Sequence, residues 1–206
     1  MSFFSSVSVG FDDEDGSEQE YVPEPWEGPP SHVLGGVVPI ERLVVQNANA
    51  VIALSHAGVF EAGVLFHVQI SARRGDMDED RWWELEQAFW GHSRPRRKGM
   101  ELPDSIRRFG VRFPDGSKAV AIGDDPFPPP QSEPTPPVLV FSGGGGGSGS
   151  GDSVESNDEL WLWPLPPAEP IEFLVEWPIA GVPLTAVELD GAALAAAASK
   201  ARPYWP

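Results

Sequence analysis

Two histidines and one carboxylate lie close together in the sequence and are of the types that bind transition metals. His56, Glu61 and His67 could form a site with two imidazoles and one carboxylate. The hairpin predicted below places His56 on its core face and His67 on its outer face, and side chains on opposite faces cannot share one metal ion. We therefore expect neither a metal site nor a cofactor.

Three further patterns of chemical interest fail at defined positions. Asp13 and Asp15 resemble the start of a calcium loop, but Phe11 and Val22 occupy positions that need oxygen ligands. The glycine run at 143–147 is not followed by Gly-Lys-Ser/Thr, so it is not a phosphate-binding loop. The chain also lacks a Gly-x-Ser-x-Gly nucleophile motif.

Glu172 and Glu176 lie on the polar face of a predicted strand, about 13 Å apart at about 3.3 Å per residue. A glycosidase carboxylate pair needs a shorter separation. We interpret these two side chains as part of a solvated face.

Basic residues concentrate in one segment of an acidic chain. The formal net charge is −17, whereas residues 73–118 carry 11 of the 14 Lys and Arg residues. The candidate partner-binding members of this basic patch are Arg73, Arg74, Arg81, Arg94, Arg96, Arg97 and Lys98, with Arg107 and Arg108 nearby. The patch could dock an acidic protein, a phosphate or RNA, or it could neutralise the acidic N-terminal tail of the same chain. Because the overall field repels nucleic acid and anionic membranes, we favour a protein partner and expect neither nucleic acid nor a membrane.

Two groups of aromatic residues supply further candidates. Tyr21 and Trp26 lie in an acidic, proline-containing segment that could dock in a groove of a partner, although Trp26 could instead pack on the protein's own body. The alternative is a ligand pocket lined by Trp82, Trp83 and Trp163, since aromatic-lined clefts are common ligand sites.

The composition excludes several classes of protein. The sequence contains no cysteine, which excludes disulfides, thiolate metal sites and thiol catalysis. Residues 1–11 have no basic residue and few apolar ones, so we expect no secretory signal there. No segment reaches the ~18 apolar residues of a membrane span. We expect a cytoplasmic protein.

Hydrophobic periodicity predicts the elements that must position these residues. Residues 171–177 alternate between apolar and polar, and residues 160–163 form an apolar run, so both are predicted strands. Helical spacing predicts a helix after Asp78 or Asp80, ending near Gly91, and Asp190 is a predicted cap for a C-terminal helix.

Two predicted hairpins follow from matching apolar positions. The first joins 42–55 to 64–73 and pairs Leu54 with Ile70 and His56 with Val68. The second turns at Pro-Asp-Gly-Ser 114–117. Its predicted register pairs Phe113 with Lys118, Val111 with Val120 and Phe109 with Ile122.

These elements predict a mainly β fold, an antiparallel β-sandwich of the immunoglobulin-like or jelly-roll-like kind, with one central helix and a C-terminal helix. Residues 1–30 are predicted to form an acidic, largely disordered tail. Residues 31–206 are predicted to form one domain with flexible loops at 124–137, which is proline-rich, and at 142–158, which is rich in Gly and Ser.

Four patterns together resemble uncharacterised proteins common in GC-rich actinobacteria. They are Arg-Phe-Gly-Val-Arg-Phe-x-Asp-Gly at 108–116, Leu-Trp-Leu-Trp-Pro-Leu-Pro-Pro at 160–167, Glu-Trp-Pro at 176–178 and the Leu-Asp-Gly that begins the terminal helix. The resemblance covers roughly residues 35–205. It implies no activity, cofactor or catalytic residue.

Taken together, the residues predict a non-enzymatic, cytoplasmic binding module that uses the basic patch and the acidic aromatic tail to bind a protein. The alternative is a small-ligand-binding protein or an enzyme with an aromatic-lined pocket. The partner and the oligomeric state stay open at this level.

Overall fold

The computed structural model describes residues 24–91, 102–123 and 133–205 of the 206-residue chain. The fold is mainly β, with antiparallel sheets and two helices, which confirms the predicted fold class. Within these three ranges no helix is long and apolar enough to cross a membrane.

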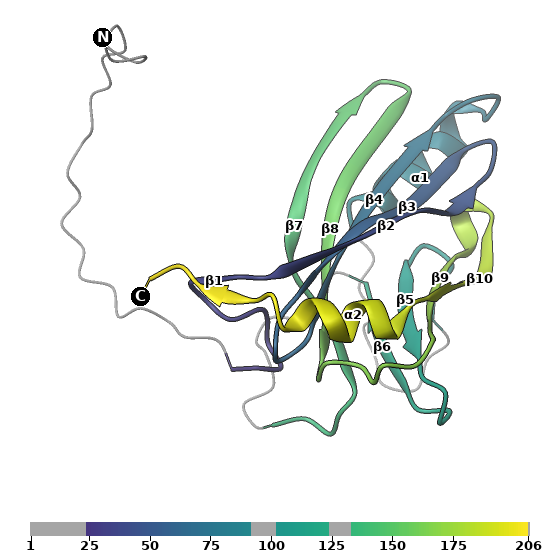
Figure 1. Ribbon diagram of the computed structural model, residues 1–206. Coiled ribbons are helices and arrows are strands. Elements are labelled where there is room, and N and C mark those ends of the chain that lie inside the picture. The colour runs from purple at the N-terminus through teal and green to yellow at the C-terminus, as the bar shows by residue number, and fades with distance from the viewer. Residues whose placement is uncertain (1–23, 92–101, 124–132, 206) are drawn as a thin grey trace, which may run out of the picture.

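The strands form two main sheets and one short ribbon (Figure 1). The five-stranded sheet has the order β2 (Gly36–Gln46), β3 (Ala50–Val59), β4 (Val64–Arg73), β8 (Ser153–Trp163) and β7 (Val138–Ser150). The four-stranded sheet has the order β10 (Val182–Leu189), β9 (Ile171–Trp177), β5 (Arg108–Arg112) and β6 (Lys118–Ile122). The ribbon pairs β1 (Val33–Leu34) with β11 (Arg202–Pro203).

The two main sheets share one hydrophobic core in a sandwich-like arrangement. Along β9 every second side chain is buried, beginning with Ile171, which is the burial pattern that its sequence alternation predicts. Aromatic rings of the two sheets meet edge to face in the core, where the ring centroids of Phe66 and Phe173 are 5.5 Å apart and those of Phe109 and Phe141 are 5.9 Å apart.

Both helices begin at the aspartates that the sequence indicates. Asp78 accepts a hydrogen bond from the backbone N–H of Arg81 at the start of α1 (Glu79–Phe89). Asp190 accepts one from Ala193 N–H at the start of α2 (Gly191–Ala198). A short 3₁₀ helix, η1 (Pro178–Ala180), follows β9.

The predicted flexible loop at 142–158 is wrong. These residues belong to the β7–β8 hairpin, in which β7 is an edge strand that runs through the glycines. Glycine pairs with β8 through the backbone alone, and the ring of Trp90 lies close over Gly147 and Gly149. Of the loop predicted at 124–137, residues 133–137 form no helix or strand, and the rest lies outside the described residues.

The predicted boundary of the disordered tail at residue 30 is also wrong, because residues 24–30 pack on the outer face of the five-stranded sheet. Trp161 is fully buried there and donates a hydrogen bond from Nε1 to the carbonyl of Pro25 (2.9 Å). Trp26 lies edge to face against Trp163, with ring centroids 5.9 Å apart, and Phe60 packs against Trp161 in the same way. Residues 1–23 lie outside the described part of the chain.

One ion pair is buried between the sheets. Nη2 of Arg107 lies 3.4 Å from Oδ2 of Asp158, and the two side chains are 7% and 8% exposed. The guanidinium also lies 5.2 Å from the ring centre of Phe89 and 5.4 Å from that of Trp177. The pair therefore joins β8 to the segment that leads into β5, inside an aromatic shell.

Candidate functional site

The outer face of the four-stranded sheet presents three rows of side chains that run across its strands. The register of the strands defines these rows. The charged row is Glu188, Glu172, Arg112 and Lys118, and the apolar row is Ala186, Leu174, Gly110 and Val120. The mixed row is Glu176, Arg108 and Ile122, with Leu184 at its β10 end, where a bulge interrupts the register. Because successive strand residues point to opposite faces, the neighbours of these residues along β5, β6 and β9 face the core.

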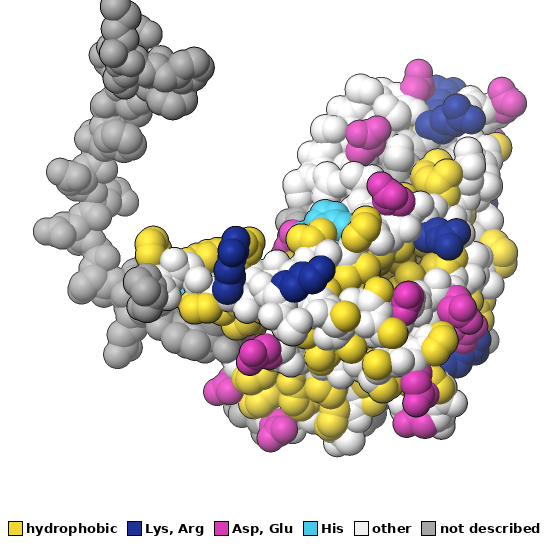
Figure 2. All heavy atoms as spheres, in the orientation of Figure 1, with side chains coloured by type: hydrophobic (Ala, Val, Ile, Leu, Met, Phe, Trp, Pro, Cys, Tyr) yellow, Lys and Arg dark blue, Asp and Glu magenta, His cyan; other side chains and the backbone are white. Residues whose placement is uncertain are grey.

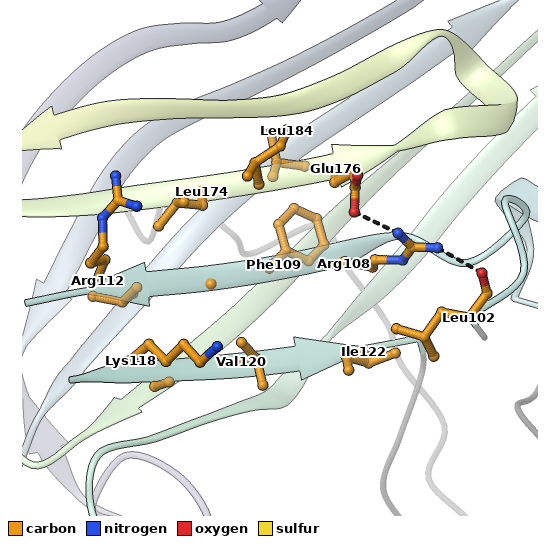
Figure 3. Close-up of a pocket in the computed structure, with 14 residues that line it drawn as sticks. Leu102, Arg108, Phe109, Arg112, Lys118, Val120, Ile122, Leu174, Glu176 and Leu184 are labelled. Carbon is orange, nitrogen blue, oxygen red and sulfur yellow. Dashed lines mark hydrogen bonds and ion pairs between the residues drawn. The ribbon is translucent and has the colours of Figure 1, made fainter. Parts of the chain in front are cut away.

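A hollow of about 340 Å³ lies over the apolar row and the residues beside it (Figure 3). Its apolar lining includes Leu174, Ile122, Leu184 and Val120, of which the last two are 64% and 55% exposed. Large apolar side chains that stay exposed together on one sheet face are typical of an interaction surface.

The hollow exists because Gly110 has no side chain in the middle of β5. A Cβ built on Gly110 would lie 3.4 Å from the carbonyl oxygen of Ala119 and 3.8 Å from the nearest atoms of Leu174 and Val120, which leaves room for it. Glycine weakens a strand, and in a strand interior it often marks close approach by a ligand or another chain. The packing around position 110 would accept a side chain, and the hollow is open because glycine has none.

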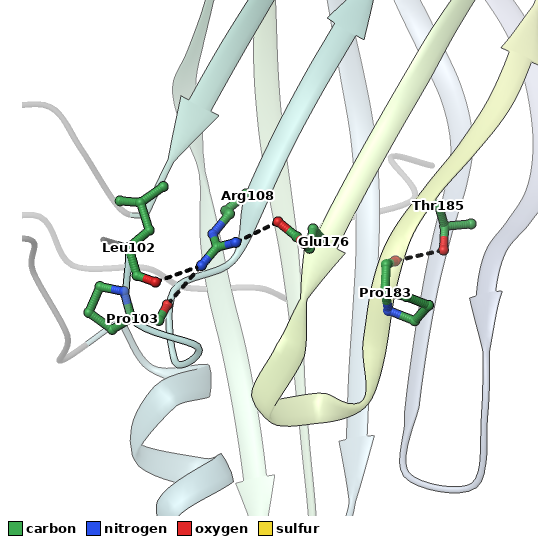
Figure 4. Close-up of polar contacts among 6 residues, drawn as sticks. All are labelled: Leu102, Pro103, Arg108, Glu176, Pro183 and Thr185. Carbon is green, nitrogen blue, oxygen red and sulfur yellow. Dashed lines mark hydrogen bonds and ion pairs between the residues drawn. The ribbon is translucent and has the colours of Figure 1, made fainter. Parts of the chain in front are cut away.

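Arg108 closes one end of the hollow in a fixed position (Figure 4). Its Nη1 lies 2.5 Å from Oε2 of Glu176, and its Nη2 donates to the carbonyl oxygens of Leu102 (2.9 Å) and Pro103 (3.2 Å). These three bonds hold the guanidinium between β9 and the segment before β5.

A second ion pair lies at the other end, between Nε of Arg112 and Oε2 of Glu172. The hydrogen bond from Arg112 lowers the pKa of Glu172 below its usual value, so Glu172 is ionised at neutral pH. Lys118, opposite Arg112 on β6, has no ion-pair partner among the residues that the structure describes. This end of the face therefore keeps one cation available.

The predicted register of the β5–β6 hairpin is wrong by one residue. Gly116 adopts a left-handed conformation (φ +84°), and Phe113 N–H donates to Ser117, so three residues form the loop where the sequence suggested four. Arg108 therefore pairs with Ile122 and Gly110 with Val120. A slip of one residue reverses every side chain of a strand, which moves Val120 and Ile122 from the predicted core to the outer face.

The structure describes only part of the predicted basic patch, and the three members that it describes lie away from the outer face of the four-stranded sheet. Arg73 donates to the carbonyl of Ala48, and Arg74 pairs with Asp152, so both lie at the end of the five-stranded sheet where β4 leads into α1. Arg81 lies on α1, near Glu84. Arg94, Arg96, Arg97, Lys98 and Tyr21 lie outside the described residues. Of the nearby arginines, Arg107 is buried and only Arg108 lies at the hollow.

The three tryptophans of the predicted ligand pocket do not come together. Trp82 is 4% exposed and donates from Nε1 to the carbonyl of Gly151, at the tip of the β7–β8 hairpin. Trp163 lies at the opposite end of the 11-residue strand β8, against Trp26, and Trp83 is 61% exposed on α1. The predicted aromatic pocket is therefore wrong: Trp82 and Trp163 pack in two separate places, and Trp83 is exposed.

The reason given for excluding a metal is wrong, because His56 and His67 lie on the same face. The predicted pairing of Leu54 with Ile70 is also wrong, because Leu54 pairs with Val68. A bulge in β3 between Leu54 and His56 then shifts the register by one residue, so that His56 pairs with His67 and the two rings stack with centroids 4.0 Å apart. Oε1 of Glu159 lies 3.4 Å from Nδ1 of His67. Among residues 24–91, 102–123 and 133–205, no three His, Asp or Glu side chains are placed to hold a metal ion.

The stacked pair predicts a loss of stability in mild acid. Burial and the adjacent His56 lower the pKa of His67 below 6.5, and Glu159 opposes the shift only in part. As pH falls through 6.5, the unfolded chain binds the proton before the folded chain does, so the free energy of unfolding decreases. Glu159→Gln should enlarge this decrease and His67→Gln should remove it, as measured by urea unfolding between pH 7.5 and about 5. An NMR titration that gives His67 a pKa above 6.5 would contradict the expectation.

A scan against family models and searches of curated proteins and of solved structures find no match to this chain.

Proposed function

We propose that this chain is a non-enzymatic binding module that takes a protein partner on the outer face of its four-stranded sheet. The observation that carries the proposal is the hollow over Gly110, which lies between two ion pairs on a sheet face that no other described element covers. The apolar row supplies area that a partner can remove from water, and the paired charges at both ends form a polar rim.

The face favours a protein over a free anion. Arg108 and Arg112 already face Glu176 and Glu172, so among the described residues of this face Lys118 is the one cation without an ion pair, and Glu188 is the one acid without one. A partner that inserts one apolar side chain into the hollow and sets one carboxylate beside Lys118 would satisfy both features. A phosphate would meet two carboxylates at close range, which is unfavourable.

Filling the hollow should abolish binding without unfolding the protein. Gly110→Val places methyl groups where the hollow lies, and a β-branched residue in place of glycine should raise the free energy of unfolding by about 0.5–1 kcal/mol. The matched control is Gly146→Val, because Gly146 lies on the exposed edge strand β7 and a Cβ there meets nothing within 4 Å.

The measurement is affinity capture from the source cell's lysate by the wild-type chain and both variants, with urea unfolding of each. We expect a specific protein that Gly146→Val retains and Gly110→Val loses by at least about tenfold. Equal capture by all three proteins, with Gly110→Val folded, would place the binding surface elsewhere and refute this use of the hollow.

A further inference from the structure

Charges on the outer face of the four-stranded sheet are sorted by strand. The acids Glu172, Glu176 and Glu188 lie on β9 and β10, and the cations Arg108, Arg112 and Lys118 lie on β5 and β6. One half of the face is therefore acidic and the other half basic, with the dividing line between β9 and β5.

Such a face is complementary to itself under one operation. A twofold axis that lies in the plane of the face, parallel to the strands and between β9 and β5, would set β9 over β5 of a second copy and β10 over β6. The operation keeps each row over the same row, because positions along the strands do not change. Every acid of one copy then faces a cation of the other, with Glu172 over Arg112 and Glu188 over Lys118.

We infer that this face binds a second copy of this chain around that twofold axis. The inference rests on the proposed function, because it assigns the partner of the same face. It makes the interface isologous, so each pairwise contact occurs twice.

The apolar row shows that shape agrees with charge. Leu174 of one copy falls over Gly110 of the other, so a half-buried leucine side chain meets the position that lacks a side chain. Val120 likewise falls over Ala186, which has the smallest side chain on β10. Leu174 of each copy therefore fits the hollow over Gly110 of the other copy.

The mixed row completes the match. Leu184 and Ile122 lie at opposite edges of the sheet and come together across the interface, and Glu176 faces Arg108. Facing sheets cross at about 30° because each is twisted, so the fit should be tightest at the central apolar row. The outer rows then meet through the long side chains of Arg, Lys and Glu.

The rest of the surface disfavours other arrangements of two copies. The chain carries a net charge of −17, and acidic side chains are scattered over the face shown in Figure 2. On the outer face of the four-stranded sheet the three acids and three cations cancel, so two copies meet there without the repulsion that other contacts would bring.

The size of the face limits the affinity between two copies. Four strands about 4.8 Å apart and five residues long cover roughly 19 by 17 Å. That area, about 320 Å² on each copy, is below the range of stable specific interfaces, so we expect a weak, transient dimer with a Kd of order 100 µM.

The first test is sedimentation equilibrium of the wild-type chain, Gly110→Val and Gly146→Val over about 1–500 µM. We expect a monomer–dimer equilibrium for the wild-type chain and for Gly146→Val, and a Kd at least about tenfold higher for Gly110→Val. A wild-type chain that stays monomeric at every concentration would overturn the inference.

The second test separates this geometry from any other dimer. The double variant Arg112→Glu/Glu172→Arg keeps both the ion pair within the chain and the complementarity between two identical copies. Mixed with the wild-type chain, it would set carboxylate against carboxylate and cation against cation. We expect the variant to dimerise with itself and to form mixed dimers with the wild-type chain at least about tenfold more weakly. Free mixing, measured with a fluorescent label on one species, would overturn the twofold arrangement.

The two proposals fail separately. A monomeric chain whose Gly110→Val variant loses a captured protein would refute the second copy as partner and leave the binding function standing. A dimer that survives Gly110→Val would refute the hollow as the dimer interface, and a captured protein that survives it would refute the hollow as the binding site of the proposed function.

Discussion

Replacing Arg107 by Met should lower the free energy of unfolding by about 3–5 kcal/mol, because the change leaves Asp158 in the interior without the facing guanidinium. A buried carboxylate has lost its hydration, and in this chain Arg107 supplies the opposite charge from between Phe89 and Trp177. The side chain of Met keeps most of the packing volume, so the loss reports on charge more than on a cavity.

A double-mutant cycle in urea unfolding separates the pair from its surroundings. Arg107→Met/Asp158→Leu removes both charges. We expect its loss of unfolding free energy to be smaller than the summed losses of the two single variants by at least about 2 kcal/mol. All four proteins must be measured at one protein concentration, because association would change the apparent stability. Additive changes, or single changes below about 1 kcal/mol, would show that the pair is not coupled in this way.

Trp161→Ala should lower the free energy of unfolding by a similar amount, about 3–5 kcal/mol, by a different mechanism. The indole is fully buried and holds residues 24–30 through its bond to the Pro25 carbonyl. Removing it leaves a cavity under Phe60 and frees the segment that Trp161 anchors, so amide hydrogen exchange in residues 24–35 should rise well above that of β9.

Trp161→Phe is the matched control. It keeps an aromatic ring and loses the N–H donor, so we expect a cost of only about 1 kcal/mol and near-normal exchange in residues 24–35. Equal costs for the two variants would mean that the hydrogen bond, and not ring burial, holds the segment in place.

The parts of the fold that the sequence predicts are those with local signals. Asp78 and Asp190 identify the helix starts because capping depends on neighbouring residues, and the alternation of 171–177 identifies β9 because a half-buried strand imposes a period of two. The strand β7 has no such signal. Glycines show no periodicity, and they form a strand here because β8 offers them a hydrogen-bonding edge.

The candidate site depends on details that alternation does not contain. A three-residue loop ending at Gly116 places Val120 outward, and a bulge before His56 stacks it on His67. Each changes the strand register by a small step and reverses which side chains are outside. The sequence did place Glu172 and Glu176 on a polar face, but their arginine partners come from another strand, 60 or more residues away.

Folding and recognition in the four-stranded sheet use positions of opposite parity. All twelve residues of the three outer rows have even numbers, whereas the core residues of β5, β6 and β9, such as Phe109, Phe173 and Val175, have odd numbers. In β10 the bulge breaks this parity, and the even-numbered Val182 is buried. A change at an even position alters what the surface recognises, and a change at an odd position alters whether the sheet forms. Descendants of this chain could therefore exchange the whole even set and acquire new partners while the odd set keeps the same core.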